Sequence, residues 1–406
     1  MSDINSETAD AISISFDGTH YVISDANAVF STTGLHGTDV IRPDAHTVKI
    51  LASSVTGINV VTAGAGAATD TVTITSLPAN IPGSVTVSAE TIHLNTSVTT
   101  TGDQTFNGAV LLGANSTVSG QDVTFNGTID GAFALIVNTS GNGVTTFGGA
   151  VGAGTALASV TTNADGSLLL NGGAITTTGA QTYHENATLG AGTVLAGSAV
   201  TFNGNLVGGG NDLTVNATTT AFGNASTDSV SGLGTLTTNA AGTTTITAGT
   251  VSGDVLLFQD NVTLGASTVL TGTTSVTFNG AITGGGNNLT VNSPSTTFGD
   301  ASTDTVSGVG VLTTDAAGTT TLNAGSVSAT TVTLNDDVTL GSNATVTATT
   351  ATFNGSLAGG GNDLTINATT TALGNASTDS VSGITTLTTN AAGTTTLNAD
   401  RSRPPR

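Results

Sequence analysis

The sequence predicts an all-β fold of the parallel β-solenoid (β-helix) type, with coils of about 19 residues grouped in units of about 76 residues. One phrase returns almost unchanged, at 223–232 (GNASTDSVSG), 299–308 (GDASTDTVSG) and 374–383 (GNASTDSVSG). A finer spacing lies inside each unit, since Phe202 is followed by Phe222 and Tyr183 by Phe202. No stretch shows sustained helical periodicity. Tandem repetition of this kind is typical of stacked architectures.

Each coil is expected to consist of short strands joined by tight corners. Runs such as VTFNG, LTVN and TTTITAG are rich in Thr, Val, Ile and Phe, and they end in Asn, Asp or Gly, which tolerate turn conformations. Stacking would place like residues above one another at roughly 4.8 Å. Four of the shorter steps make up about one 76-residue unit, so equivalent residues are expected to recur every four coils.

Regularly spaced phenylalanines are the predicted core of the stack. Each interior aromatic ring would contribute roughly 1.5–3 kcal/mol through burial. The expected structural core ladder comprises Phe106, Phe125, Phe202, Phe222, Phe258, Phe278, Phe298 and Phe353.

Three regions are expected along the chain. Residues 1–85 differ from the repeats and form either a cap or diverged first coils, with Pro78 and Pro82 near the boundary because proline cannot donate to a strand ladder. The solenoid is predicted to span 86–400, with units at about 125–201, 202–276, 277–351 and 352–400. Residues 401–406 (RSRPPR) form a tail outside the repeat.

Composition excludes several functional classes. The net charge is −21, and Arg42 and Lys49 are the only basic residues before Arg401. Because nucleic-acid binding depends on Lys and Arg neutralising phosphates, nucleic acid and anionic membranes are poor partners. No cysteine is present, which excludes disulfides and thiolate sites. No apolar run is long enough for membrane insertion, and the N-terminus lacks a signal-peptide pattern.

Acidic residues in the repeats have two interpretations. The run GGGNDLTVN resembles a calcium-binding nonapeptide, but Asp212 becomes Asn288 and Ala134 in other units, which favours a turn. A second position is acidic in three units, as Asp228, Asp304 and Asp379. Turn capping through backbone amides is the favoured interpretation there, because residues one unit apart are too distant to share an ion.

The remaining candidate residues are also better explained by structure. His184 and Glu185 occupy a corner that holds Gln259-Asp260 and Asn335-Asp336 in later units, so acid–base chemistry is not expected there. His93 has no paired ligand nearby. Threonine runs at 243–245, 319–321 and 394–396 suggest a water-ordering face, but they recur only once per unit, and little between them shares their frame.

The phrases between 124 and 204, from TFNG through TTFGGAVG and LASVTTNADG to VTFNG, resemble the repeats of large bacterial exoproteins. These are the filamentous-haemagglutinin-like and autotransporter-passenger adhesins, and the resemblance covers residues 98–400. It implies a right-handed parallel β-helix, export across the outer membrane and display at the cell surface. No catalytic residue is carried over. The chain shows neither a signal peptide nor a translocator barrel, so a fragment or another export signal is expected.

The sequence therefore predicts a non-enzymatic adhesin or structural rod, secreted or at the bacterial cell surface. Its expected partners are a host or neighbouring cell surface, a glycan or the matrix, through multivalent weak contacts. Lateral self-association is also considered. No catalytic, cofactor or metal residue is predicted.

Two alternatives stay open. A calcium-responsive extracellular module would suit a chain with 26 acidic and five basic residues. A polysaccharide-acting β-helix enzyme would need clustered acids or a basic partner in one groove, and the repeats contain no Lys or Arg.

Overall fold

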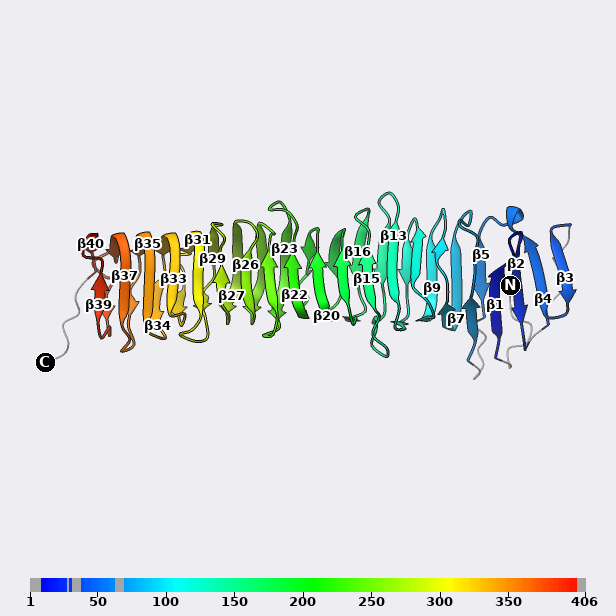
Figure 1. Cartoon of the computed structure of the whole chain (residues 1–406), viewed down its shortest axis with the longest axis horizontal. Coiled ribbons are helices and arrows are strands. Elements are labelled where there is room, and N and C mark those ends of the chain that lie inside the picture. The colour runs from blue at the N-terminus through cyan, green and yellow to red at the C-terminus, as the bar shows by residue number, and fades with distance from the viewer. Residues whose placement is uncertain (1–8, 28, 31–37, 63–68, 400–406) are drawn as a thin grey trace. The chain divides into compact units, whose positions relative to one another are not determined.

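The computed structural model describes residues 9–27, 29–30, 38–62 and 69–399, and within them it contains no α-helix. Parallel strands stack coil upon coil, which confirms the predicted all-β solenoid (Figure 1). The chain divides into two compact units, Met1–Ala199 and Val200–Arg406.

The strands of the first unit are β1 (Ala11–Phe16), β2 (His20–Asp25), β3 (Val40–Asp44), β4 (Thr47–Leu51), β5 (Ile58–Val61), β6 (Thr71–Ile74), β7 (Val85–Leu94), β8 (Val98–Thr99), β9 (Gln104–Leu112), β10 (Ser116–Gly120), β11 (Val123–Phe125), β12 (Ile129–Asp130), β13 (Ala134–Thr139), β14 (Val144–Phe147), β15 (Ser159–Thr162), β16 (Ser167–Leu170), β17 (Ala174–Thr176), β18 (Ala180–Tyr183) and β19 (Asn186–Leu189). A 3₁₀ turn, η1 (Ala52–Ser54), separates β4 from β5.

The first unit begins with antiparallel strands and continues with parallel ones. β1 pairs with β2, β2 with β4, and β3 with β4, all antiparallel. β5 and β6 instead pair in parallel with β7, and β1 also pairs in parallel with β6. Strands β1 to β4 therefore form an antiparallel sheet, whereas β5 and β6 already belong to the parallel stack.

β20 (Thr193–Phe202) crosses the boundary between the units. The strands of the second unit are β21 (Leu206–Val207), β22 (Leu213–Phe222), β23 (Ser229–Thr238), β24 (Thr243–Ile246), β25 (Thr250–Phe258), β26 (Asn261–Leu264), β27 (Thr268–Phe278), β28 (Ile282–Thr283), β29 (Leu289–Asn292), β30 (Ser295–Phe298), β31 (Thr305–Thr314), β32 (Thr319–Leu322), β33 (Ser326–Leu334), β34 (Asp337–Leu340), β35 (Ala344–Phe353), β36 (Leu357–Ala358), β37 (Leu364–Leu373), β38 (Val381–Ser382), β39 (Leu387–Thr389) and β40 (Thr394–Leu397).

The sequence repeat and the coil do not coincide in the second unit. One interior column passes from coil to coil through Leu213, Leu236, Leu256, Val276 and Thr296. The repeat equivalent of Leu213 is Leu289, which lies in a different column, beside Thr268 and Leu312. The expectation that equivalent residues recur every four coils is therefore wrong.

The reason is the unequal length of the corners. Register partners are 24 residues apart where the GNASTD corner intervenes, as between Thr219 and Thr243, but only 18 apart between Thr243 and Asn261. Longer corners use up residues without adding strands. One 76-residue repeat consequently completes three coils and only part of a fourth, and each copy starts on a different side of the stack.

The phenylalanines predicted for the core are all buried, with at most 1% of the residue surface exposed. They form several short columns, not one ladder, because of the same shift between repeat and coil. The stacked ring pairs, with centroid distances of 5.0–6.1 Å, are Phe106–Phe125, Phe125–Phe147, Phe202–Phe222, Phe258–Phe278 and Phe278–Phe298. Phe147 also belongs to the core, and Phe353 stacks in register with Leu334 and Leu373.

Candidate functional site

Outward-facing threonines form continuous rows on the second unit. Thr277, Thr297, Thr321 and Thr339 follow one another in register through four coils. A parallel row two residues earlier on the later strands consists of the hydroxyl-bearing Ser295 and Thr319, followed by the carboxylate of Asp337. Neighbouring hydroxyl groups are therefore spaced roughly 4.8 Å between coils and roughly 6.7 Å along a strand.

A second side of the same unit carries a similar array. Thr331, Thr350, Thr370 and Thr394 form one row, and Thr333 and Thr352 belong to the row beside it. The sequence-based expectation that little shares the frame of the threonine runs is thus wrong. The shift between repeat and coil brings threonines from different phrases onto one side, which a comparison of equivalent positions does not reveal.

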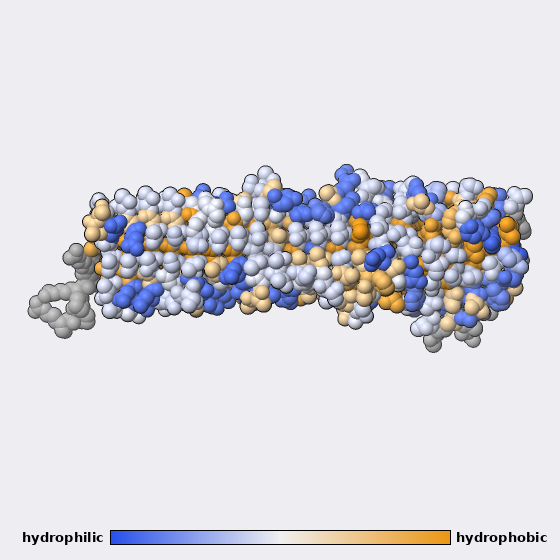
Figure 2. Space-filling view, in the orientation of Figure 1, coloured by the Kyte–Doolittle hydropathy of each residue, from blue (hydrophilic) through white to orange (hydrophobic). Residues whose placement is uncertain are grey.

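The visible surface is dominated by side chains of intermediate hydropathy, with a narrow apolar line along the second unit (Figure 2). A shallow groove of about 450 Å³ lies on this unit, lined by small and hydroxyl-bearing residues that include Val309, Ala329, Thr347 and Ala348. Successive coils contribute to this groove, since Val309 lies in register with Ala329. The groove is therefore built across stacked coils and not from one specialised loop.

Buried carboxyl groups form the second notable feature. Glu185, Asp260 and Asp336 stand one per repeat, and at most 2% of each residue is exposed. Each follows a buried Tyr, Phe or Leu by two positions (Tyr183, Phe258 and Leu334). Since residues two apart in a strand share a face, this spacing was a signal for an inward-pointing acid. Sequence reasoning treated these positions as polar corners and missed it.

Asp260 lies on the corner between β25 and β26 and is bonded to threonines of the coil beneath. Its Oδ1 accepts from the Thr238 hydroxyl at 2.6 Å, and its Oδ2 from the Thr244 hydroxyl at 2.8 Å. The Gln259 amide donates to Thr238 Oγ1 at 3.2 Å. The two threonines that flank the NAAG corner at 239–242 therefore both donate to one carboxyl group.

Asp336 repeats this arrangement one unit later. It accepts hydrogen bonds from Thr314 and Thr320, each at 2.7 Å. Beneath the second threonine of each cluster lies a further buried threonine, Thr220 under Thr244 and Thr296 under Thr320. The hydroxyl oxygens of Thr220 and Thr296 have no hydrogen-bond partner among the described residues.

Glu185 is the diverged member of the set. Its Oε2 accepts from the Thr162 hydroxyl, but Leu168 stands where the later repeats have a second threonine. The Oε1 atom is buried and has no hydrogen-bond partner among the described residues. Nearby, the Tyr183 hydroxyl donates to Gln181 Oε1 at 2.9 Å.

Burial raises the pKa of all three acids. It raises the pKa of Glu185 to about 7, against a bond from Thr162 that lowers it. Burial likewise raises the pKa of Asp260 and of Asp336, and the charge of Asp315 raises the latter further. No Lys or Arg exists between residues 50 and 400 to stabilise the charged forms. Asp260 and Asp336 are separated by more than three coils, roughly 17 Å, too far to cooperate in catalysis.

The acidic residues that were candidates for calcium binding accept hydrogen bonds from backbone amides. Asp228 Oδ2 accepts from the amides of Asn224 and Ala225, both at 2.9 Å, and Asp304 and Asp379 do the same in their units. Asp212 Oδ1 accepts from the Thr235 amide at 2.7 Å. Asn288 makes the equivalent bond to Val311 at 2.9 Å, so this corner does not require a charge.

The two histidines singled out from the sequence are less buried than Glu185, Asp260 and Asp336. His184 is exposed and points away from the interior that holds its neighbour Glu185, while His93 is half-buried on β7. Among the described residues, no three His, Asp or Glu side chains gather as metal ligands. The structure thus aligns threonine hydroxyl groups in rows and places single carboxyl groups beside buried threonines.

Comparison with protein-family models, curated proteins and solved structures gives no match. Within the described part of the chain, no helix has the length and apolar character needed to span a bilayer.

Proposed function

We propose that this chain is a non-enzymatic structural module of a secreted or surface-displayed bacterial adhesin. In this proposal it makes many weak contacts with a host or neighbouring cell surface, a glycan or the matrix. The observation that carries the proposal is the register of outward hydroxyl groups, with Thr277, Thr297, Thr321 and Thr339 in one row. Repeating one weak contact at each coil raises overall affinity without a deep pocket.

The charge distribution of the chain favours binding of an uncharged partner over binding of a polyanion. The chain carries a net charge of −21 and offers no Lys or Arg between residues 50 and 400. Polyanions would be repelled, whereas neutral glycans can exchange hydrogen bonds with threonine hydroxyls. Sideways association between copies through the same rows is a further part of the proposal.

The test is binding of the full chain to a glycan array and to cell surfaces, with and without calcium. We expect saturable binding that falls at least tenfold in the double variant Thr297→Glu, Thr321→Glu, because carboxylates interrupt the row. Thr274→Glu, at an exposed position outside the row, should bind like the parent chain. Equal binding by all three chains would refute a contact through this row. Measurable cleavage of acidic polysaccharides would refute the non-enzymatic assignment.

A second candidate function is the ordering of water at an ice surface. The paired rows on β30 and β32 present outward hydroxyl groups at regular spacings, roughly 4.8 Å between coils and roughly 6.7 Å along a strand, as an ordered array of the kind that a water-ordering face needs. Thermal hysteresis measured on the full chain decides between the candidates. Activity that is lost in Thr297→Tyr, Thr321→Tyr and kept in Thr274→Tyr would support ice binding, and freezing indistinguishable from a buffer control would refute it.

A further inference from the structure

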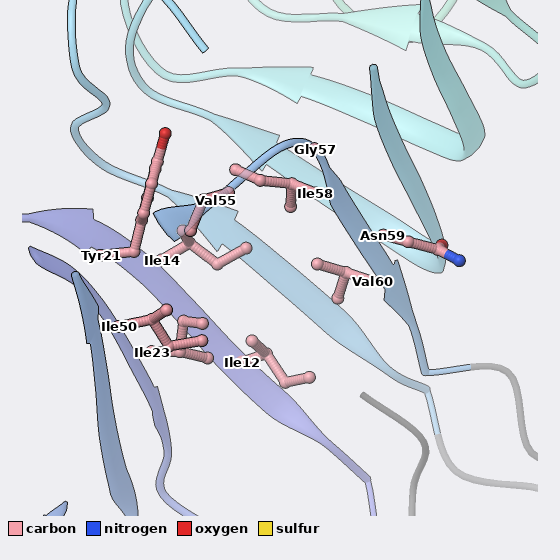
Figure 3. Close-up of a pocket in the computed structure, with 10 residues that line it drawn as sticks. All are labelled: Ile12, Ile14, Tyr21, Ile23, Ile50, Val55, Gly57, Ile58, Asn59 and Val60. Atoms are coloured by element: carbon pink, nitrogen blue, oxygen red, sulfur yellow. The ribbon is translucent and has the colours of Figure 1, made fainter. Parts of the chain in front are cut away.

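The first unit contains an apolar cavity of about 200 Å³ where its antiparallel sheet meets the first parallel strand. β1, β2 and β4 supply one wall, and β5 with the segment after η1 supplies the other (Figure 3). Its main lining side chains are Ile12, Ile14, Ile23, Ile50, Val55 and Ile58. Branched aliphatic groups from two differently organised sheets cannot interdigitate as regular coils do, which leaves the space unfilled.

The polar groups of the lining are placed at its margins. Tyr21 is 2% exposed, and Figure 3 shows its hydroxyl directed away from Ile12 and Ile23. Asn59 extends its amide toward the opposite margin in the same view. None of the lining residues carries a charge. The interior of the cavity is therefore a hydrocarbon surface that offers shape and apolar contact.

We propose that this cavity is a binding site for an uncharged hydrocarbon group, such as the end of an alkyl chain or a single ring. An apolar cavity of about 150 Å³ can remain dry and accept benzene, so the larger space here has room for about six to eight carbon atoms. Burial of such a group removes apolar surface of both ligand and isoleucines from water. Anionic ligands are disfavoured because they would lose hydration without gaining a cationic partner.

Tyrosine fluorescence provides a direct readout. Tyr21 and Tyr183 are the only tyrosines and tryptophan is absent, so Tyr183→Phe leaves Tyr21 as the one strong emitter. The replacement is mild, since phenylalanine fills comparable core positions such as Phe106. In this background 1-hexanol should produce a saturable change in emission and raise the melting temperature. Hexanoate at neutral pH should bind at least tenfold more weakly.

Variants of the lining make the test specific. Val60→Phe projects a ring from β5 into the cavity and should abolish the response, while Val207→Phe, at an exposed site in the other unit, should not. If Val60→Phe fails to fold, Ile58→Ala enlarges the cavity and should favour 1-octanol over 1-hexanol relative to the parent. Absence of saturation up to the solubility limit of hexanol, or identical titrations of parent and Val60→Phe, would overturn the proposal.

A parallel titration with lipid vesicles distinguishes the two possible sources of the hydrocarbon group, a lipid acyl chain and a small soluble molecule. Phosphatidylcholine vesicles that shift Tyr21 emission and are displaced by 1-octanol would assign the acyl chain of a lipid. A response to the free alcohol without one to vesicles would assign a small soluble molecule. Both results support the same cavity chemistry.

Discussion

The carboxyl group of Asp260 accepts a 2.6 Å hydrogen bond from the hydroxyl of Thr238, which belongs to the coil beneath it. Thr244, at the other end of the same corner, binds the second carboxyl oxygen at 2.8 Å. A chain rich in Thr, Gly and Ala has few features that distinguish one stacking register from the next. The two threonines both donate to one carboxyl group of the adjacent coil, so this contact favours the observed register.

Removing the Asp260 carboxyl should be costly. Asp260→Ala leaves two buried hydroxyl groups without their acceptor, and we expect a loss of about 2–4 kcal/mol in the free energy of unfolding. Asp260→Asn keeps an acceptor and should cost about 1 kcal/mol. Asp254→Ala, which removes an exposed carboxyl bonded to Thr273, should change stability by less than about 0.5 kcal/mol. Urea unfolding followed by circular dichroism measures all three, and equal losses at both sites would contradict the role of burial.

Stability should depend on pH through Glu185. Its pKa in the folded chain is about 7, above the ordinary value of 4.5, so the folded state binds this proton more tightly than the unfolded state. The stability it contributes is complete below pH 4.5 and is lost as the pH rises through 7. Glu185→Gln removes the titration, and between pH 5 and 8 its melting temperature should fall less than that of the parent, by roughly 2–4 °C.

The matched control for this titration is Asp165→Asn. Asp165 lies on the corner loop that follows Thr162 but is exposed. Its variant should keep the pH dependence of the parent chain. A parent chain and Glu185→Gln with parallel melting profiles would show that Glu185 does not titrate in this range.

Phe278 should be among the most sensitive core positions of the second unit. Its ring stacks on Phe258 at 5.3 Å and on Phe298 at 5.7 Å, so truncation opens a cavity in the middle of a column. Phe278→Ala should cost about 3–5 kcal/mol. Thr274→Ser, exposed on the same strand, should stay within about 0.5 kcal/mol. Denaturant midpoints provide the comparison, and two small effects would place the phenylalanine column outside the stabilising core.

The sequence was sufficient to predict the fold because stacking follows from local pattern. Alternation placed Phe106 and Phe278 inside, and turn residues marked the corners. It was not sufficient for the alignment of coils, since corner length decides which residues face each other. Thr297 and Thr321 come from different phrases, and only the register reveals them as neighbours. The inward orientation of the Glu185 side chain was predictable, because Glu185 follows the buried Tyr183 by two positions. Its polarity alone suggested an exposed position at a corner.

Calcium should leave the chain's stability unchanged, and the corner at Asp212 shows why. The Asp212 carboxyl accepts the Thr235 amide at 2.7 Å, and Asn288 accepts the Val311 amide in the same way at 2.9 Å. The side-chain amide oxygen of an asparagine therefore accepts the same hydrogen bond without a charge. Asp212→Asn should alter the free energy of unfolding by less than about 0.5 kcal/mol. Melting temperatures measured with millimolar calcium chloride and with a chelator should agree within error for both chains. A bound ion stabilises only the state that holds it. A melting temperature that rises with calcium in the parent, but not in Asp212→Asn, would therefore establish this corner as a calcium site and favour a calcium-responsive module.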